Sequence, residues 1–162
     1  MPEEAERARR DRVFLVVVDD SPERAVALRY AALRAAKSGG RVALLRVIEP
    51  VEQTEWAGIG ALMAQEQREE AEAMLAGLAA QVQAITGGLP MLITREGKTA
   101  DQLLALLAED PRISILVLAS SADGKGPGPL IQAMTGRLAT KMTVPMTVVP
   151  GTMSEAELDR VT

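Results

Sequence analysis

Two short segments of this 162-residue chain carry side chains that could do binding chemistry. Residues 19–21 read Asp-Asp-Ser and directly follow an apolar run, while residues 120–129 combine Ser, Gly and Pro with one cation, Lys125. A glycine-rich loop can wrap a phosphate group with its backbone N–H groups, and a lysine adds positive charge to such a cradle. A connector that binds no ligand has the same composition, so both interpretations remain open.

The residue types that are missing exclude much of enzyme and metal chemistry. The chain has no His and no Cys, which excludes thiolate nucleophiles, a Ser-His-Asp triad and every imidazole or thiolate metal site. We therefore expect no catalytic residue and no metal ion. The net charge is -4, the wrong sign for neutralising a phosphate backbone, and the single Phe14, Tyr30 and Trp56 provide no base-stacking platform. Nucleic-acid binding is not expected.

Hydropathy indicates neither a membrane span nor a targeting segment. The longest apolar run of strand character, Val13–Val18, is far shorter than the roughly 20 residues that cross a bilayer. The first twelve residues are charged and lack the apolar stretch of a signal peptide. We therefore expect no membrane partner and a cytoplasmic location.

Apolar runs alternate with helical periodicity along the chain. Strands are predicted at residues 13–18, 42–48, 91–94, 113–119 and 146–149. Helices are predicted from Pro22 to the Gly39-Gly40 pair, at 62–84, at 99–108 with Thr99 as its cap, and from about 129 to Met142. A mobile loop is expected at 51–60. Helical crossovers require parallel strands, so the sequence predicts a doubly wound, open three-layer α/β domain with five strands in the order 3-2-1-4-5 and four helices.

The chain is expected to form one domain with two loose ends. Residues 1–12 form a charged N-terminal extension, residues 13–151 the α/β domain, and residues 152–162 a C-terminal tail. Ser154 and Glu157 match a short capping box, but a tail of this length frays by default.

The predicted topology brings the two candidate segments together. Ligands of open parallel sheets bind beyond the carboxyl ends of the strands, where the strand order reverses beside the first strand. Residues 19–21 follow the first strand and residues 120–129 follow the fourth, so they would form opposite walls of one site. Asp19 and Asp20 are neighbours at a strand end and point to opposite faces, so a shared proton is not implied.

Several segments together resemble the universal stress protein family. The strand and turn at 16–23 with Ala25, the strand end Leu45-Arg46-Val47, and the closing strand 144–149 all match in order and spacing, and the likeness covers Asp11 to Gly151. The resemblance implies a stress-response or regulatory binding protein rather than an enzyme. It also implies a homodimer that pairs the fifth strand, with Met146 and Val148, across a two-fold axis, and this pairing would protect an apolar sheet edge.

The resemblance also identifies positions that bear on ATP binding. One branch of the family binds ATP through Gly-x2-Gly-x9-Gly-Ser/Thr, which ends about thirteen residues before the proline of the closing strand. Counted back from Pro145, these four positions hold Ala119, Ala122, Gln132 and Ala133, so all four motif residues are replaced. Added side chains keep backbone amides away from phosphate, and Ala133 has no hydroxyl to donate. The sequence therefore predicts no cofactor and no tight ATP binding in the usual pose.

A nucleotide sensor remains the alternative. Asp19 matches the acidic residue near the base, although it could equally cap its own turn, and the Val47 backbone matches a second contact. Asp20 replaces the usual Gly and brings a like charge toward a bound anion. Lys125 and Gly126 in the Gly124 to Gly128 loop could restore a phosphate contact for ATP or AMP. Nucleotide hydrolysis is the weakest hypothesis, because no catalytic group is assembled for it.

Overall fold

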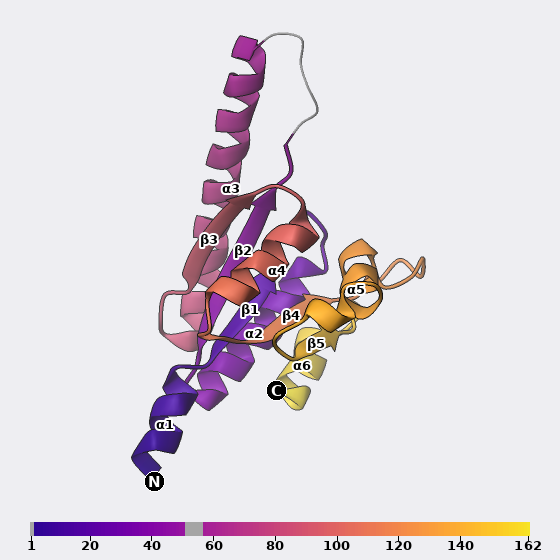
Figure 1. Ribbon diagram of the computed structural model, residues 1–162. Coiled ribbons are helices and arrows are strands. Elements are labelled where there is room, and N and C mark those ends of the chain that lie inside the picture. Colours follow the sequence, from indigo (N-terminus) through magenta and orange to yellow (C-terminus); the bar gives the residue numbers. More distant parts are fainter. Residues whose placement is uncertain (1, 51–56) are drawn as a thin grey trace.

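A five-stranded parallel sheet forms the middle layer of the computed structural model, which describes residues 2–50 and 57–162 (Figure 1). Its strands run in the order β3-β2-β1-β4-β5, and all four neighbouring pairs are parallel. The strands are β1 Val13–Val17, β2 Arg41–Ile48, β3 Met91–Glu96, β4 Ile113–Ala119 and β5 Met146–Val149. The predicted fold class and strand order are therefore confirmed.

Helices cover both faces of the sheet (Figure 1). They are α1 Pro2–Arg10, α2 Arg24–Ser38, α3 Ala57–Thr86, α4 Thr99–Glu109, α5 Pro129–Thr135 and α6 Glu155–Val161, with a short 3-10 turn at Ala139–Lys141. The described residues thus form six α-helices, and the expected number of four is wrong. The two additional helices, α1 and α6, lie in the terminal segments that were expected to be loose.

The central strand β1 is apolar at every position because each face meets a layer of helices. Phe14 and Val16 of β1 pack with α2 and α3, whereas Leu15 and Val17 pack with α4 and α5. All five β1 residues are buried. The two cores therefore hold the carboxyl end of β1, which leads into residues 19–21, in a fixed position.

Helix α3 begins earlier than its sequence indicates. Residues 57–60, expected to belong to a mobile loop, form its first turn, while the rest of that predicted loop and Trp56 lie outside the described residues. Two glycines in this turn, Gly58 and Gly60, lower its helical propensity and concealed the start. The first half of α3 extends beyond the sheet (Figure 1).

The helix after the fourth strand is shorter than predicted. It ends at Thr135 instead of continuing to Met142. Gly136 follows with φ -95 and ψ -116, which is not a helical conformation. After the break, Ala139–Lys141 form a separate 3-10 turn before β5.

The C-terminal segment forms helix α6 and docks on α2, so the expected fraying is wrong. Leu158 is 2% exposed and lies in the core that α2 helps to form. Arg29 Nη2 of α2 contacts Asp159 Oδ1 at 2.9 Å, and Lys37 Nζ donates to Thr162 Oγ1 at 3.3 Å. Ser154 Oγ accepts a hydrogen bond from Glu157 N at 3.2 Å. A single buried leucine with a working cap is too weak a pattern to reveal this docking from sequence.

A Ser154→Ala variant tests whether α6 is docked. Removal of an N-cap hydroxyl costs about 1 kcal/mol when the helix is part of the folded unit. We expect chemical denaturation to show this loss in the free energy of unfolding. The loss should be smaller for Glu155→Ala, which removes an exposed carboxylate of the same first turn but no capping hydrogen bond. An unchanged midpoint for Ser154→Ala would mean that the helix frays.

Within the described part of the chain, no helix combines the length and the apolar character needed to cross a lipid bilayer.

Candidate functional site

A cavity of about 430 Å³ opens beyond the carboxyl ends of β1 and β2. Three residues expected at the site, Asp19, Asp20 and Val47, line it together. Residues that were not predicted to belong to the site complete the wall. They are Arg46, Glu49, Gln67, Glu70, Ala71, Met74 and Thr99, with Val17, Val18 and Ile48 at the strand ends. The cavity therefore lies at the carboxyl edge of the sheet on the β2 side of β1, whereas the strand order reverses between β1 and β4.

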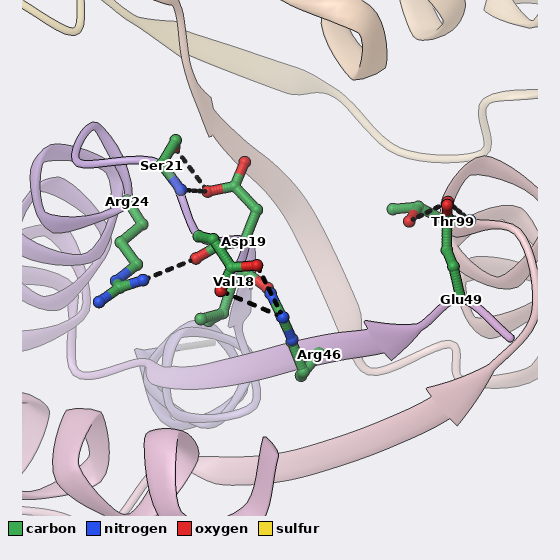
Figure 2. A network of polar contacts seen from close by, with 8 residues as sticks. Val18, Asp19, Ser21, Arg24, Arg46, Glu49 and Thr99 are labelled. Atoms are coloured by element: carbon green, nitrogen blue, oxygen red, sulfur yellow. Dashed lines mark hydrogen bonds and ion pairs between the residues drawn. The ribbon is translucent and has the colours of Figure 1, made fainter. Parts of the chain in front are cut away.

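Arg46 ties the end of β1 to β2 and neutralises Asp20. Its Nη2 lies 3.2 Å and 3.1 Å from the two carboxylate oxygens of Asp20. Its Nη1 donates to Val18 O at 3.2 Å (Figure 2). The Arg46 side chain is 20% exposed and that of Asp20 is 76% exposed. Arg46 is the one cation among the described residues that line the cavity. Because it is already paired, little of its charge remains for an anionic ligand. Arg46 could have been identified as a candidate site residue from the sequence, because it is a charged residue near the end of the otherwise apolar stretch of β2.

Asp19 holds the turn between β1 and α2. Its Oδ1 accepts hydrogen bonds from Ser21 N at 2.9 Å and from Ser21 Oγ at 2.5 Å (Figure 2). Arg24 Nη1 donates to Asp19 O at 3.0 Å. The aspartate thus caps its own turn, one of the two roles left open by the sequence. Ser21 is engaged with Asp19, and α2 begins only at Arg24.

Glu49 closes the rim of the cavity on the β3 side. Its Oε1 accepts from Thr99 Oγ1 at 3.1 Å and from Thr99 N at 3.3 Å (Figure 2). Thr99 was expected to cap α4, but it is the first residue of that helix, and Glu49 binds its free amide instead. Glu49 directly follows β2, so the same strand-end rule that identified Asp19 applies to it.

The cavity wall carries more negative than positive charge. Asp19, Asp20, Glu49 and Glu70 contribute carboxylates, while Arg46 is the cation among the lining residues. Opposed charges within a partly solvated cavity interact by on the order of 1 kcal/mol each, and like charges repel by a similar amount. The wall is therefore suited to neutral or weakly charged groups rather than to a polyphosphate.

A second hollow of about 90 Å³ lies between the β1–α2 turn and the loop that follows β4. Asp19, Glu23, Ala119 and Gly128 are among its lining residues. Beside it, Ala122 N donates a hydrogen bond to Glu23 Oε1 at 3.0 Å. This backbone hydrogen bond is the main cause of a lowered pKa of Glu23, supported by the glutamate's own backbone N–H and opposed by partial burial. Sequence reasoning missed Glu23, which lies 99 positions from its partner.

Other predicted site residues lie away from both cavities. Lys125 and Gly126 are exposed and line neither of the two, and Lys125 N is held by Asp123 Oδ1 at 2.9 Å. Gln132 is exposed on α5, with its side-chain amide next to Gly126. Ala133 packs against the core beneath α4 and α5. The structure therefore assembles Asp19, Asp20 and Val47 on one side but leaves the proposed phosphate-binding residues dispersed.

Comparison with solved structures establishes the fold independently. The universal stress protein UspA from Lactobacillus plantarum superposes with a TM-score of 0.70 at 14% identity, over 85% of this chain and 96% of that one. A universal stress protein family member from Burkholderia pseudomallei gives 0.63 at 18% identity, over 85% and 95%. A universal stress protein in complex with cAMP gives 0.61 at 15% identity, over 87% and 98%. At such low identity the likeness concerns the fold.

Sequence comparison identifies the family. No curated protein matches the chain. The sequence model of the universal stress protein family matches residues 12–150, close to the span from Asp11 to Gly151 that carries the resemblance. The chain therefore belongs to the universal stress protein family.

Proposed function

We propose that this chain is a cytoplasmic, homodimeric regulatory protein of the stress response that acts by binding rather than by catalysis. It does not hold ATP tightly in the pose used by the ATP-binding branch of its family. The observation that carries the proposal is the charge of the 430 Å³ cavity. Among the described residues that line it, four contribute carboxylates and one, Arg46, is a cation that is already paired with Asp20.

The cavity charge opposes the phosphates of a nucleotide more than its base. Asp20 lies at the turn after β1, where the family usually has a glycine. Arg46 neutralises Asp20 through an ion pair, and this pair uses the positive charge that could otherwise attract a phosphate. Glu49 and Glu70 add charge on the far side. Every further phosphate therefore increases the repulsion, so affinity should fall from adenosine to AMP to ATP.

The loop after β4 supports the same conclusion. Ala119 and Ala122 stand at positions where glycines would admit phosphate, and Ala133 is turned into the core without a hydroxyl to offer. Lys125 lies outside both cavities. A polyphosphate would thus meet no prepared amide cradle. The cations among the described residues that line the two cavities, Arg46 and Arg24, already contact Asp20 and the backbone oxygen of Asp19.

Thermal unfolding with added nucleotide tests the proposal. We expect protein purified without nucleotide to show no adenine absorbance, and millimolar ATP to shift its melting temperature by less than about one degree, since stabilisation requires binding to the folded state. A shift of several degrees that Lys125→Ala abolishes would overturn the proposal and favour an ATP sensor.

The second candidate function is a sensor that binds a ligand with less negative charge than ATP, such as adenosine or AMP. The 430 Å³ cavity has room for a small ligand, with Asp19 and Val47 in its wall, and one structural neighbour was solved with cAMP. If adenosine or AMP raises the melting temperature while ATP does not, this candidate is favoured. In an Asp19→Ala variant, adenosine or AMP should then no longer raise the melting temperature. Because Asp19 also holds the turn between β1 and α2, circular dichroism must first show that the variant is folded.

The sheet edge supports the dimer. β5 pairs with β4 through the register Leu118–Val148, and among the described strands it is the last on that side. Val148 is 40% exposed, and Pro145 and Pro150 bound the strand. An apolar edge strand needs a cover, and a second copy paired across a two-fold axis supplies one.

A further inference from the structure

Three chain segments meet at the side chain of Glu23. The glutamate belongs to the turn before α2, Ala122 to the loop after β4, and Gly151 to the exit of β5. Glu23 Oε1 accepts from Ala122 N at 3.0 Å. A Cβ on Gly151 would lie 2.7 Å from Glu23 Cγ, so the glycine lets the glutamate stem pass close by. Gly151 N donates to Ser120 Oγ at 3.3 Å, which joins the exit of β5 to the same loop.

The Glu23 side chain binds the loop after β4 and does not cap helix α2. Glu23 occupies the N-cap position of α2, yet its side chain makes no capping hydrogen bond. Its carboxylate instead crosses to the loop after β4. Ala122 is exposed, so water could satisfy its amide without help from a side chain. The contact is therefore not explained by the need to satisfy a buried donor.

The Ala122 amide is placed where an anion would be received. It lies beyond the carboxyl end of β4, on the β1 side, where the strand order reverses. The lining of the hollow beside it includes Glu23, Asp19 and the cation Arg24. Arg24 Nη1 already donates to Asp19 O at 3.0 Å. A backbone N–H at this point of an open parallel sheet is a donor for a ligand anion. Here a carboxylate of the chain itself already accepts from it.

The carboxylate keeps its charge at neutral pH. The Ala122 amide is the largest cause of the lowered pKa of Glu23, followed by its own backbone N–H, with a smaller contribution from Ser21. Asp123 opposes these effects. An anion approaching the loop therefore meets both an occupied donor and a negative charge.

We propose that Glu23 is a built-in competitor for anions at the loop after β4, so that a phosphate group reaches the Ala122 amide only by displacing the carboxylate. This inference rests on the proposed function and deepens it, because it names a residue that determines which ligands the site refuses. Glu23 would oppose an anion in two ways that can be tested separately: its negative charge repels the anion, and its hydrogen bond occupies the Ala122 amide.

Two variants separate these parts. Glu23→Gln removes the charge but retains an oxygen that can accept from Ala122, whereas Glu23→Ala removes the charge and frees the amide. Glu155→Ala is the matched control, because it removes an exposed glutamate from the start of another helix, α6. Circular dichroism and the melting temperature establish that each variant is folded.

The probes are inorganic tripolyphosphate and ATP, followed by calorimetry and by the amide resonance of Ala122. Wild type and Glu155→Ala should show only weak binding. Glu23→Ala should bind tripolyphosphate about tenfold or more tightly, and Glu23→Gln should lie between, because a freed hydrogen bond and a removed like charge each contribute. The Ala122 resonance should move on adding tripolyphosphate to Glu23→Ala.

Each other outcome contradicts the inference. Equal affinities of wild type and Glu23→Ala would show that the glutamate excludes nothing. Equal gains for Glu23→Ala and Glu23→Gln would show that charge alone acts, without competition for the amide. The proposed function fails in a different way, through tight ATP binding by the wild type, so the two failures are distinguishable.

Discussion

A Val148→Glu variant is expected to elute from a sizing column as a monomer, at a protein concentration where the wild type elutes as a dimer. Val148 lies on the outer strand of the sheet and is 40% exposed in the single chain. Pairing of β5 with its copy would bury this side chain close to the two-fold axis. A carboxylate there would be desolvated without a partner, and it would face its symmetry mate.

The size of this effect follows from the cost of an uncompensated buried charge. Leaving one charge unpaired in an interface costs about 3–5 kcal/mol, which corresponds to a dissociation constant raised by roughly a hundredfold or more. Light scattering coupled to the sizing column gives the mass directly. The same experiment on wild type establishes whether the dimer forms at all.

Leu92→Glu is the matched control for this prediction. Leu92 lies on β3, the strand at the opposite edge, and is 46% exposed. We expect it to leave the dimer intact. A dimeric Val148→Glu protein, or a monomeric Leu92→Glu protein, would show that the fifth strand is not the interface.

The sheet was predictable because its signals are local and redundant. β1 is a continuous apolar run and β4 is apolar except at Ser114, and both end at polar residues. Each intervening helix supplies the crossover that requires parallel pairing. The ends of the chain lacked such signals. Helix α6 buries only Leu158 among its residues, so no periodic stripe marks it, and its docking depends on Arg29 and Lys37 more than a hundred positions away.

The candidate site was predictable only where it follows from strand ends. Asp19 and Asp20 were identified because the residue after a central strand lies at the mouth of the site. Which partner each carboxylate takes was not predictable, since Asp19 turns back to Ser21 while Asp20 pairs with Arg46 on the neighbouring strand. Glu23 had no signal at all, because its contact with Ala122 exists only once β1 and β4 lie side by side.

A Gly151→Ala variant is expected to lose about 2–3 kcal/mol of folding stability, a typical cost of overpacking. A Cβ at this position would collide with the backbone carbonyl oxygen of Ser120 and approach Glu23 Cγ to 2.7 Å. The glutamate stem can move, but Ser120 O belongs to a backbone fixed at the end of β4, where Ser120 N donates to Val149 O at 2.9 Å. The strand exit or the loop must therefore shift.

Thermal unfolding should show this loss as a fall in melting temperature on the order of 5–10 °C for a chain of this size. Gly77→Ala is the control, because Gly77 lies inside α3 with open space around it. Alanine there should stabilise the protein by up to about 1 kcal/mol through its higher helical propensity. If Gly151→Ala melts as the wild type does, the three segments at Glu23 are not tightly packed. The close approach of Gly151 is therefore a test of the junction on which the competition for the Ala122 amide depends.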